Sequence, residues 1–163
     1  MNWIARHLRR YRERKPWDFC WRIGLESTVV GFIAATLLGV VFDEPTRDLL
    51  DWPMPVAFRL WLVVAPPIET LIFQAFPIFI VRALKGSIRF QILVSTFLFS
   101  AAHLSEGIVT GLSAGAIGGL YYAFAYAHWR SQSRWQALWI TTVCHGISNG
   151  ICFILLVVLG HWS

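Results

Sequence analysis

The segment Leu60–Val81, LWLVVAPPIETLIFQAFPIFIV, decides the fold of this chain. Its only charged side chain is Glu69, and apolar residues make up most of the rest. A membrane-spanning helix needs about 20 predominantly apolar residues, each adding about 1.5 Å of length. The segment therefore predicts a transmembrane helix that carries a carboxylate near its middle.

Similar apolar runs occur on both sides of this segment. With it they predict five spans, over Ile23–Phe42, Leu60–Val81, Phe90–Leu104, Ile108–His128 and Trp135–Leu159. Backbone polar groups within hydrocarbon must be satisfied inside helices or closed barrels, and the period-two pattern of a barrel is absent. The expected fold class is an all-α integral membrane protein, a bundle of about five transmembrane helices.

The composition of the chain agrees with this fold class. Its 163 residues are 56% hydrophobic and only 14% charged, with nine Trp and twelve Phe, which excludes an ordinary cytosolic domain and a disordered chain. Cys20, Cys144 and Cys152 have the spacing of neither a disulfide framework nor paired zinc ligands. We expect one transmembrane helical domain over residues 23–163, preceded by a basic segment over residues 1–22.

The positions of the basic residues predict the orientation. Twelve of the 14 Lys and Arg precede the first span or fall in the second and fourth connections between predicted spans, the exceptions being Arg47 and Arg59. Short cytoplasmic segments carry such an excess, so the N-terminus is expected in the cytoplasm of a multi-pass cell-membrane protein, with the bacterial inner membrane as the expected location. The net charge of +5 is mostly this basic segment and reflects topology.

The basic segment 1–22 predicts an amphipathic helix that lies on the membrane surface. One helical face collects the apolar and aromatic residues Trp3, Ile4, His7, Leu8 and Tyr11, and arginines occupy the rest. Such a helix binds anionic lipid, which is therefore an expected partner. Nucleic-acid binding is the rival interpretation, but five attached spans argue against it, and we expect no nucleic acid.

Four polar side chains lie inside the predicted spans at matched depth. Counted from the basic residue that bounds each span, they lie 11–15 residues inside it, or about 16–22 Å from the cytoplasmic edge. They are Glu69, His103, His145 and Asn149. A polar group is costly within the membrane, so each is a functional-site candidate. Any one could be a hydrogen-bonded packing residue, but the shared depth favours a single buried site.

Local spacing supports this site. Pro66-Pro67 is expected to break or kink the second span, which places Glu69 in the first turn of the following helical segment. His145 and Asn149 are four residues apart, so they share one face of a helix.

Other features of the spans predict packing rather than chemistry. Gly111, Gly115 and Gly119 recur every four residues and predict a groove for close helix approach, within one chain or between chains. Glu26 and His128, near cytoplasmic ends, are expected to extend their polar atoms to the interface.

Three short motifs resemble those of the CPBP intramembrane proteases, the family of CAAX-processing and bacteriocin-processing (Abi-type) membrane endopeptidases. The Glu-Glu-x-x-x-Arg motif would fall on Glu69–Gln74, the Phe-x-x-x-His motif on Phe99–His103, and the His-x-x-x-Asn motif on His145–Asn149. The resemblance covers about residues 60–160. It implies an intramembrane endopeptidase that hydrolyses a peptide bond in a membrane-associated protein or peptide.

The resemblance also implies roles for the four polar residues. Glu69 and His103 would activate a water molecule, while His145 and Asn149 would stabilise the oxyanion. A carboxylate and an imidazole can share general-base work, and fixed donors are most effective in a water-poor cavity. One Glu with two His is also a set of zinc ligands, but no His-Glu-x-x-His occurs, so we expect catalysis without a metal or cofactor and keep zinc as the alternative.

The chain departs from the family pattern at two positions. Thr70 replaces the second Glu and Gln74 replaces the Arg, and these two residues, four apart, are expected to hydrogen-bond where an ion pair would stand. No motif describes the substrate, so a prenylated CAAX tail, a bacteriocin leader and a juxtamembrane segment all fit. The oligomeric state is equally open.

Two other classes of function fit parts of the sequence. Gly111–Gly115 resembles the Gly-x-Ser-x-Gly motif of a rhomboid-like serine protease, with Ser113 as nucleophile and His145 as base, although Glu69 would then have no role. A non-catalytic membrane binding or immunity protein with a degenerate site is the other class. A small proton carrier is disfavoured because no inverted repeat is visible.

Overall fold

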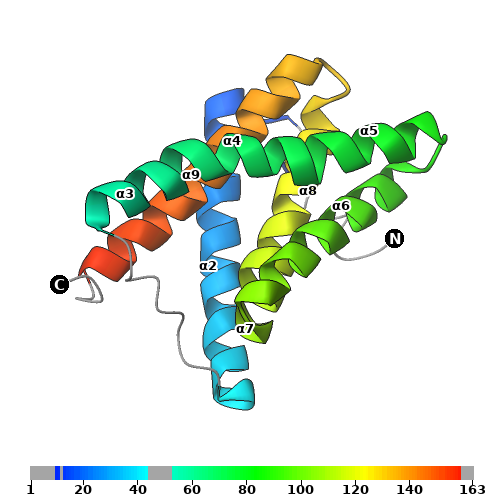
Figure 1. Cartoon of the computed structure of the whole chain (residues 1–163). Coiled ribbons are helices and arrows are strands. Elements are labelled where there is room, and N and C mark those ends of the chain that lie inside the picture. The colour runs from blue at the N-terminus through cyan, green and yellow to red at the C-terminus, as the bar shows by residue number, and fades with distance from the viewer. Residues whose placement is uncertain (1–9, 12, 44–52, 159–163) are drawn as a thin grey trace.

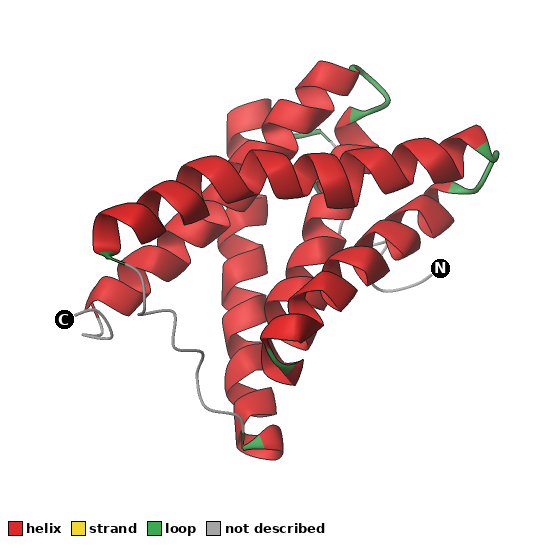
Figure 2. Ribbon diagram, viewed as in Figure 1, coloured by secondary structure: helices red, strands yellow, loops and turns green. Residues whose placement is uncertain are grey.

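A computed structural model of the chain describes residues 10–11, 13–43 and 53–158. Within these ranges every regular element is helical and none is a strand, as Figure 2 shows. Five helices are long and apolar enough to cross a membrane: Pro16–Phe42, Met54–Ala83, Ile88–Glu106, Ile108–Trp129 and Arg134–Leu155. The prediction of an all-α membrane protein with five spans is confirmed.

The first span is helix α2, Pro16–Phe42, which begins at Pro16 rather than at Ile23. Proline suits the first turn of a helix because that turn needs no intrahelical amide donor. Residues 16–22 of the predicted basic segment therefore belong to the span helix. Most of the predicted amphipathic helix lies outside the described residues, but Tyr11 is described and is buried, with its ring centroid 6.1 Å from that of Phe19.

The second span is one continuous rod that crosses the front of Figure 1. It consists of α3 (Met54–Phe58), a π-helical segment (Arg59–Val64), α4 (Ala65–Glu69), a second π-helical segment (Thr70–Ala75) and α5 (Phe76–Ala83).

Each π-helical segment ends two residues before a proline, Pro66 in one case and Pro77 in the other. A proline lacks an amide hydrogen and its ring collides with the preceding helical turn, and a wider π turn relieves this collision. Of the break or kink expected at Pro66-Pro67, the break is absent, because the helix continues from Met54 to Ala83. Glu69 is the last residue of α4 and does not lie in the first turn of a new helical segment.

The third and fourth spans pack against each other along the glycine stripe. The third is α6 (Ile88–His103) with a 3₁₀ turn (Leu104–Glu106), and the fourth is α7 (Ile108–Thr110), a π-helical segment (Gly111–Gly118) and α8 (Gly119–Trp129). A Cβ atom on Gly115 would lie 2.8 Å from the Cα of Ser100, and one on Gly119 would lie 3.0 Å from Cδ1 of Phe99. The predicted groove is confirmed, and it acts within the chain.

The fifth span, α9 (Arg134–Val158), crosses α2 at a small polar contact. A Cβ atom on Gly24 would lie 2.9 Å from the Cβ of Ile147, so only glycine allows this approach. At the crossing, Ser148 Oγ donates to the Gly24 carbonyl at 3.0 Å and lies 2.6 Å from Ser27 Oγ. The side chain of Ser148 therefore joins α9 directly to the backbone of α2.

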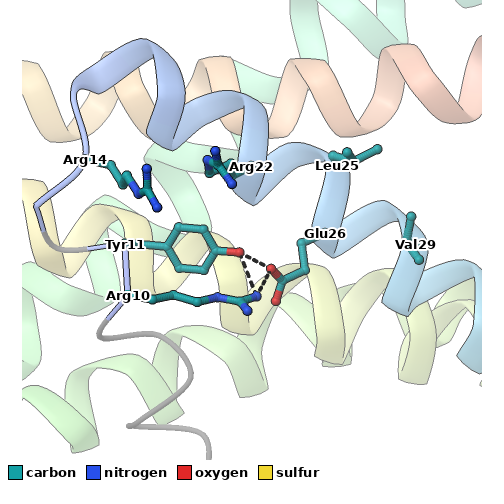
Figure 3. A pocket seen from close by; sticks show the side chains of 7 residues that line it. All are labelled: Arg10, Tyr11, Arg14, Arg22, Leu25, Glu26 and Val29. Carbon is teal, nitrogen blue, oxygen red and sulfur yellow. Dashed lines mark hydrogen bonds and ion pairs between the residues drawn. The ribbon is translucent and has the colours of Figure 1, made fainter.

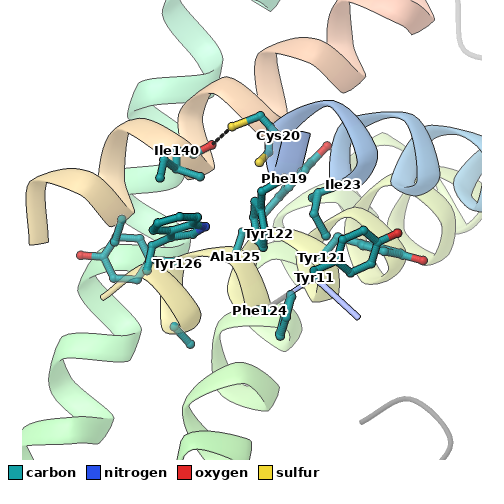
Figure 4. Packing of buried hydrophobic residues seen from close by; sticks show 14 of the residues in the cluster. Tyr11, Phe19, Cys20, Ile23, Tyr121, Tyr122, Phe124, Ala125, Tyr126 and Ile140 are labelled. Carbon is teal, nitrogen blue, oxygen red and sulfur yellow. Dashed lines mark hydrogen bonds between the residues drawn. The ribbon is translucent and has the colours of Figure 1, made fainter. Parts of the chain in front are cut away.

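An aromatic cluster fills the core at the cytoplasmic end predicted for the bundle (Figure 4). The Phe19 ring stacks on His128 at 5.5 Å and meets Trp129 edge-on at 5.5 Å. His128 is thus packed inside the bundle rather than extended to the interface. Glu26 likewise binds residues of the protein rather than extending to the interface. It accepts hydrogen bonds from Tyr121 Oη at 2.7 Å and from Arg10 and Tyr11.

We expect Gly115→Ala to destabilise the protein by about 1–3 kcal/mol, because the added methyl group meets backbone that cannot rotate away. Gly39→Ala is the matched control, since nothing lies within 4 Å of the added Cβ and alanine favours the helix. Thermal unfolding in detergent measures both variants. Equal unfolding temperatures for the two would contradict the close approach of α6 and the fourth span.

Candidate active site

Glu69 and His145 face each other in the interior of the bundle. The second span and α9 are in contact, and this contact brings Glu69 Oε2 to 3.7 Å from His145 Nε2. The His145 side chain is 4% exposed and that of Glu69 is 27% exposed. A nearly buried imidazole therefore lies beside a carboxylate that remains partly accessible. The expectation that these two residues share one layer is confirmed.

Two aromatic rings hold the imidazole of His145. Tyr122 from α8 stacks on it with ring centroids 4.4 Å apart and an interplanar angle of 23°. Phe99 from α6 meets it edge-on, at 5.8 Å and 81°. Stacked and edge-on contacts are the favoured aromatic geometries, so both the position and the plane of the imidazole are restrained. The sequence did not identify Tyr122.

His103 belongs to the same cluster through Phe99. Its Nδ1 lies 2.9 Å from the Phe99 carbonyl oxygen, and the two rings are 4.4 Å apart. A carbonyl only accepts hydrogen bonds, so Nδ1 carries the hydrogen and the lone pair of the neutral ring is on Nε2. Among the described residues, no ion pair or hydrogen bond joins His103 directly to Glu69.

Asn149 joins α9 to the second span. Its Nδ2 donates to the Trp61 carbonyl at 2.9 Å. Trp61 lies in the first π-helical segment, where the Leu60 carbonyl accepts from the amide of Ala65, five residues ahead. The same register would pair the Trp61 carbonyl with Pro66, which has no amide hydrogen. The side chain of Asn149 supplies the Trp61 carbonyl with a hydrogen-bond donor that Pro66 cannot provide.

Thr70 and Gln74, the two departures from the family pattern, are fully buried. Neither the Thr70 hydroxyl nor the Gln74 amide has a hydrogen-bond partner in the described ranges, so the expected bond between them is wrong. The reason is local geometry. Thr70–Ala75 is π-helical, and the wider turn removes the alignment that residues four apart have on an α-helix.

The described side chains do not form a metal centre. Among them, no group of three or more His, Cys, Asp or Glu side chains is arranged to hold a metal ion. Glu69 and His145 are close, but three ligands do not converge on one point as zinc requires. We therefore derive no step through a metal.

Ser113 does not form the arrangement of a serine protease in the described structure. Its hydroxyl donates to the Val109 carbonyl of its own helix at 2.6 Å, and the residue is buried. A nucleophilic serine needs a base within hydrogen-bond reach, and none of the described histidines bonds to it.

Comparison with known families gives one match for this chain. A model of the Rce1-like family, type II CAAX prenyl endopeptidases, matches residues 51–151, a segment that contains all four polar residues of the predicted layer. The chain belongs to this family. It is a multi-pass membrane protease that acts on a membrane-associated protein or peptide. Comparison with curated proteins and with solved structures gave no match.

We expect Tyr122→Ala to lower proteolysis about 100-fold, because the imidazole of His145 loses its stacking partner and a small displacement of a reacting group is costly. Tyr122→Phe keeps the ring and should stay within about threefold of the wild type. Cleavage rates per folded protein in proteoliposomes measure this effect. Tyr126→Ala is the control, a buried tyrosine one helical turn away, and a loss as large as that of Tyr122→Ala would show that the effect is only structural.

We expect Thr70→Val to stabilise the protein by about 1 kcal/mol, because it replaces a buried hydroxyl that has no partner in the described residues by a methyl group of similar size. Thr28→Val is the matched control. Thr28 is also buried, but its hydroxyl donates to the Gly24 carbonyl at 2.8 Å, so this variant should lose stability. Chemical denaturation in detergent compares the two, and a destabilised Thr70→Val would point to a partner for that hydroxyl.

Proposed function

We propose that this chain is an intramembrane endopeptidase of the glutamic type, with Glu69 as the general base. The observation that carries the proposal is the contact of the Glu69 carboxylate with His145 Nε2 at 3.7 Å, inside a bundle of spans. A carboxylate in such a place is costly, and function is the usual reason for its presence. Its side chain is 27% exposed, so the carboxylate is not sealed inside the protein.

The proposed reaction is hydrolysis of a peptide bond. Glu69 takes a proton from a water molecule whose oxygen forms a bond with the carbonyl carbon, and this gives a tetrahedral oxyanion. The carbon–nitrogen bond then breaks as the proton passes from Glu69 to the leaving nitrogen. His103 shares in activating the water, a role supported by the hydrogen bond that leaves its lone pair on Nε2.

His145 and Asn149 are the proposed oxyanion donors. His145 Nε2 faces the carboxylate, so a hydrogen on this atom points into the space where the oxyanion would form. Asn149 uses one amide hydrogen on the Trp61 carbonyl, and its second amide hydrogen serves the proposed role. Because that bond also fixes the amide, little reorganisation is required when charge develops.

The same proposal includes the kind of substrate, the membrane in which the protein resides and its orientation there. The substrate is a prenylated CAAX tail, a bacteriocin leader or a juxtamembrane segment of another membrane protein. The protein resides in the bacterial inner membrane with its N-terminus in the cytoplasm, where the basic segment 1–22 contacts anionic lipid. The spacing of basic residues supports this orientation.

We expect Glu69→Gln to lower proteolysis by about 10²–10⁴-fold, the usual contribution of a general base, because the amide cannot accept the proton. Mass spectrometry of membrane-protein termini compares cells that produce the wild type and the variant at equal membrane levels. Termini found only with the wild type identify substrates directly.

Ser113→Ala is the control in this experiment. It removes the nucleophile of a rhomboid-like mechanism and should leave the termini of the wild type intact. Loss of cleavage in Ser113→Ala, with activity retained in Glu69→Gln, would assign the reaction to the serine. Identical termini for the wild type and Glu69→Gln under several growth conditions would indicate a non-catalytic binding protein.

A further inference from the structure

A cavity of about 510 Å³ lies beside the N-terminal half of α2 (Figure 3). The residues that line it are Arg10, Tyr11, Arg14, Arg22, Leu25, Glu26 and Val29. Its volume is within the usual range for small-molecule sites. None of these residues belongs to the proposed active site, so this cavity is a separate feature of the molecule.

One end of the cavity is positively charged. Arg14 and Arg22 both bind Asp18, through Nη1 at 3.3 Å and through Nε at 2.8 Å. A single carboxylate is thus shared by two guanidinium groups, each of which has five N–H donors. Both arginine side chains are about half exposed, at 45% and 52%, so their other donors are accessible to an anion.

Among the described residues, Glu26 is the one carboxylate that lines the cavity, and its charge is compensated. It pairs with Arg10 and also accepts hydrogen bonds from Tyr11 and Tyr121. Its side chain is only 18% exposed. Within the described residues, the three arginines therefore outweigh Glu26 and the adjacent Asp18 by one positive charge.

The other end of the cavity is apolar. Leu25 and Val29 are four residues apart on α2, and both line the cavity. Val29 lies about 10 Å along the helix from Arg22, in the direction of the membrane interior. Leu25 and Val29 are 53% and 48% exposed, so an apolar chain can lie against them.

We propose that this cavity binds one anionic phospholipid of the cytoplasmic leaflet. The phosphate lies on Arg14 and Arg22, and an acyl chain lies along Leu25 and Val29. Guanidinium groups bind phosphate through paired, charge-assisted hydrogen bonds. The charged end lies at the membrane surface and the apolar end lies deeper, which is the orientation of a lipid, whereas a soluble phosphate would make no use of the apolar end. This site rests on the proposed cytoplasmic orientation of the basic segment and deepens its proposed lipid contact, but it does not depend on Glu69 or on catalysis.

Native mass spectrometry of the full chain in detergent tests this proposal, with phosphatidylglycerol and phosphatidylcholine as probes. We expect phosphatidylglycerol to bind at least about tenfold more tightly. The double variant Arg14→Gln/Arg22→Gln should lose about tenfold or more of this affinity, because each cation near a lipid surface contributes about fivefold. Arg130→Gln/Arg134→Gln removes two other cytoplasmic arginines, which do not line the cavity, and should change the affinity less than threefold.

A third variant predicts the opposite effect. Asp18→Asn removes the carboxylate that competes for Arg14 and Arg22, so it should tighten phosphatidylglycerol binding by about threefold or more. This gain does not require the double variant to fold.

Four results would overturn the proposal. Equal losses in the two double variants would mean that only total charge matters, and equal binding of both lipids would remove the selectivity. Weaker binding by Asp18→Asn would exclude the arginine pair as the phosphate site. Displacement of the lipid by micromolar glycerol 3-phosphate would identify a soluble phosphate as the ligand.

Discussion

The interior of a membrane offers no water to polar groups, so the protein itself must supply their partners. The prolines of the second span make this constraint acute because each one removes an amide donor from the helix. Asn149 of α9 donates to the Trp61 carbonyl, and Ser95 of α6 donates to the Phe73 carbonyl at 2.7 Å, one turn before Pro77. The same bonds fix the second span against its neighbours and so hold Glu69 beside His145.

The burial of Thr70 and Gln74 gives this chain a different interior from a chain that carries the full Glu-Glu-x-x-x-Arg motif. Both side chains are inaccessible, and both are neutral. Burying an amide and a hydroxyl costs much less free energy than burying a charge that lacks a partner. A buried glutamate and a buried arginine at these two positions would have to compensate each other, whereas Thr70 and Gln74 carry no charge that needs a partner.

The sequence was informative about depth within the bundle, which depends on distance along each helix. The rise of a helix is constant, so counting from the basic ends placed Glu69 and His145 at one depth without knowledge of packing. The glycine stripe was equally readable because its spacing repeats on one helix. The stacking of Tyr122 on His145 could not be predicted from the sequence, because it depends on how α8 and α9 are rotated about their axes. The interface position predicted for Glu26 was wrong, because its hydrogen-bond partner Tyr121 is 95 residues away in the sequence. The break that was one of the two outcomes expected at Pro66-Pro67 is absent, because the wide turn before the prolines lets the helix continue and a local rule does not foresee such a turn.

The π-helical segment Thr70–Ala75 begins directly after Glu69. A wide turn of this kind holds one more residue than an α-helical turn, so it can absorb a single inserted residue without breaking the helix. Everything beyond the insertion is rotated by about 100° relative to everything before it. In a uniform α-helix, the direction in which one half presents its side chains fixes the direction of the other half. The wide turn removes this coupling between the two halves of the second span. The half that ends at Glu69 contacts α9 and the half that begins at Phe76 contacts α6, so the wide turn lies where the span changes from one neighbour to the other.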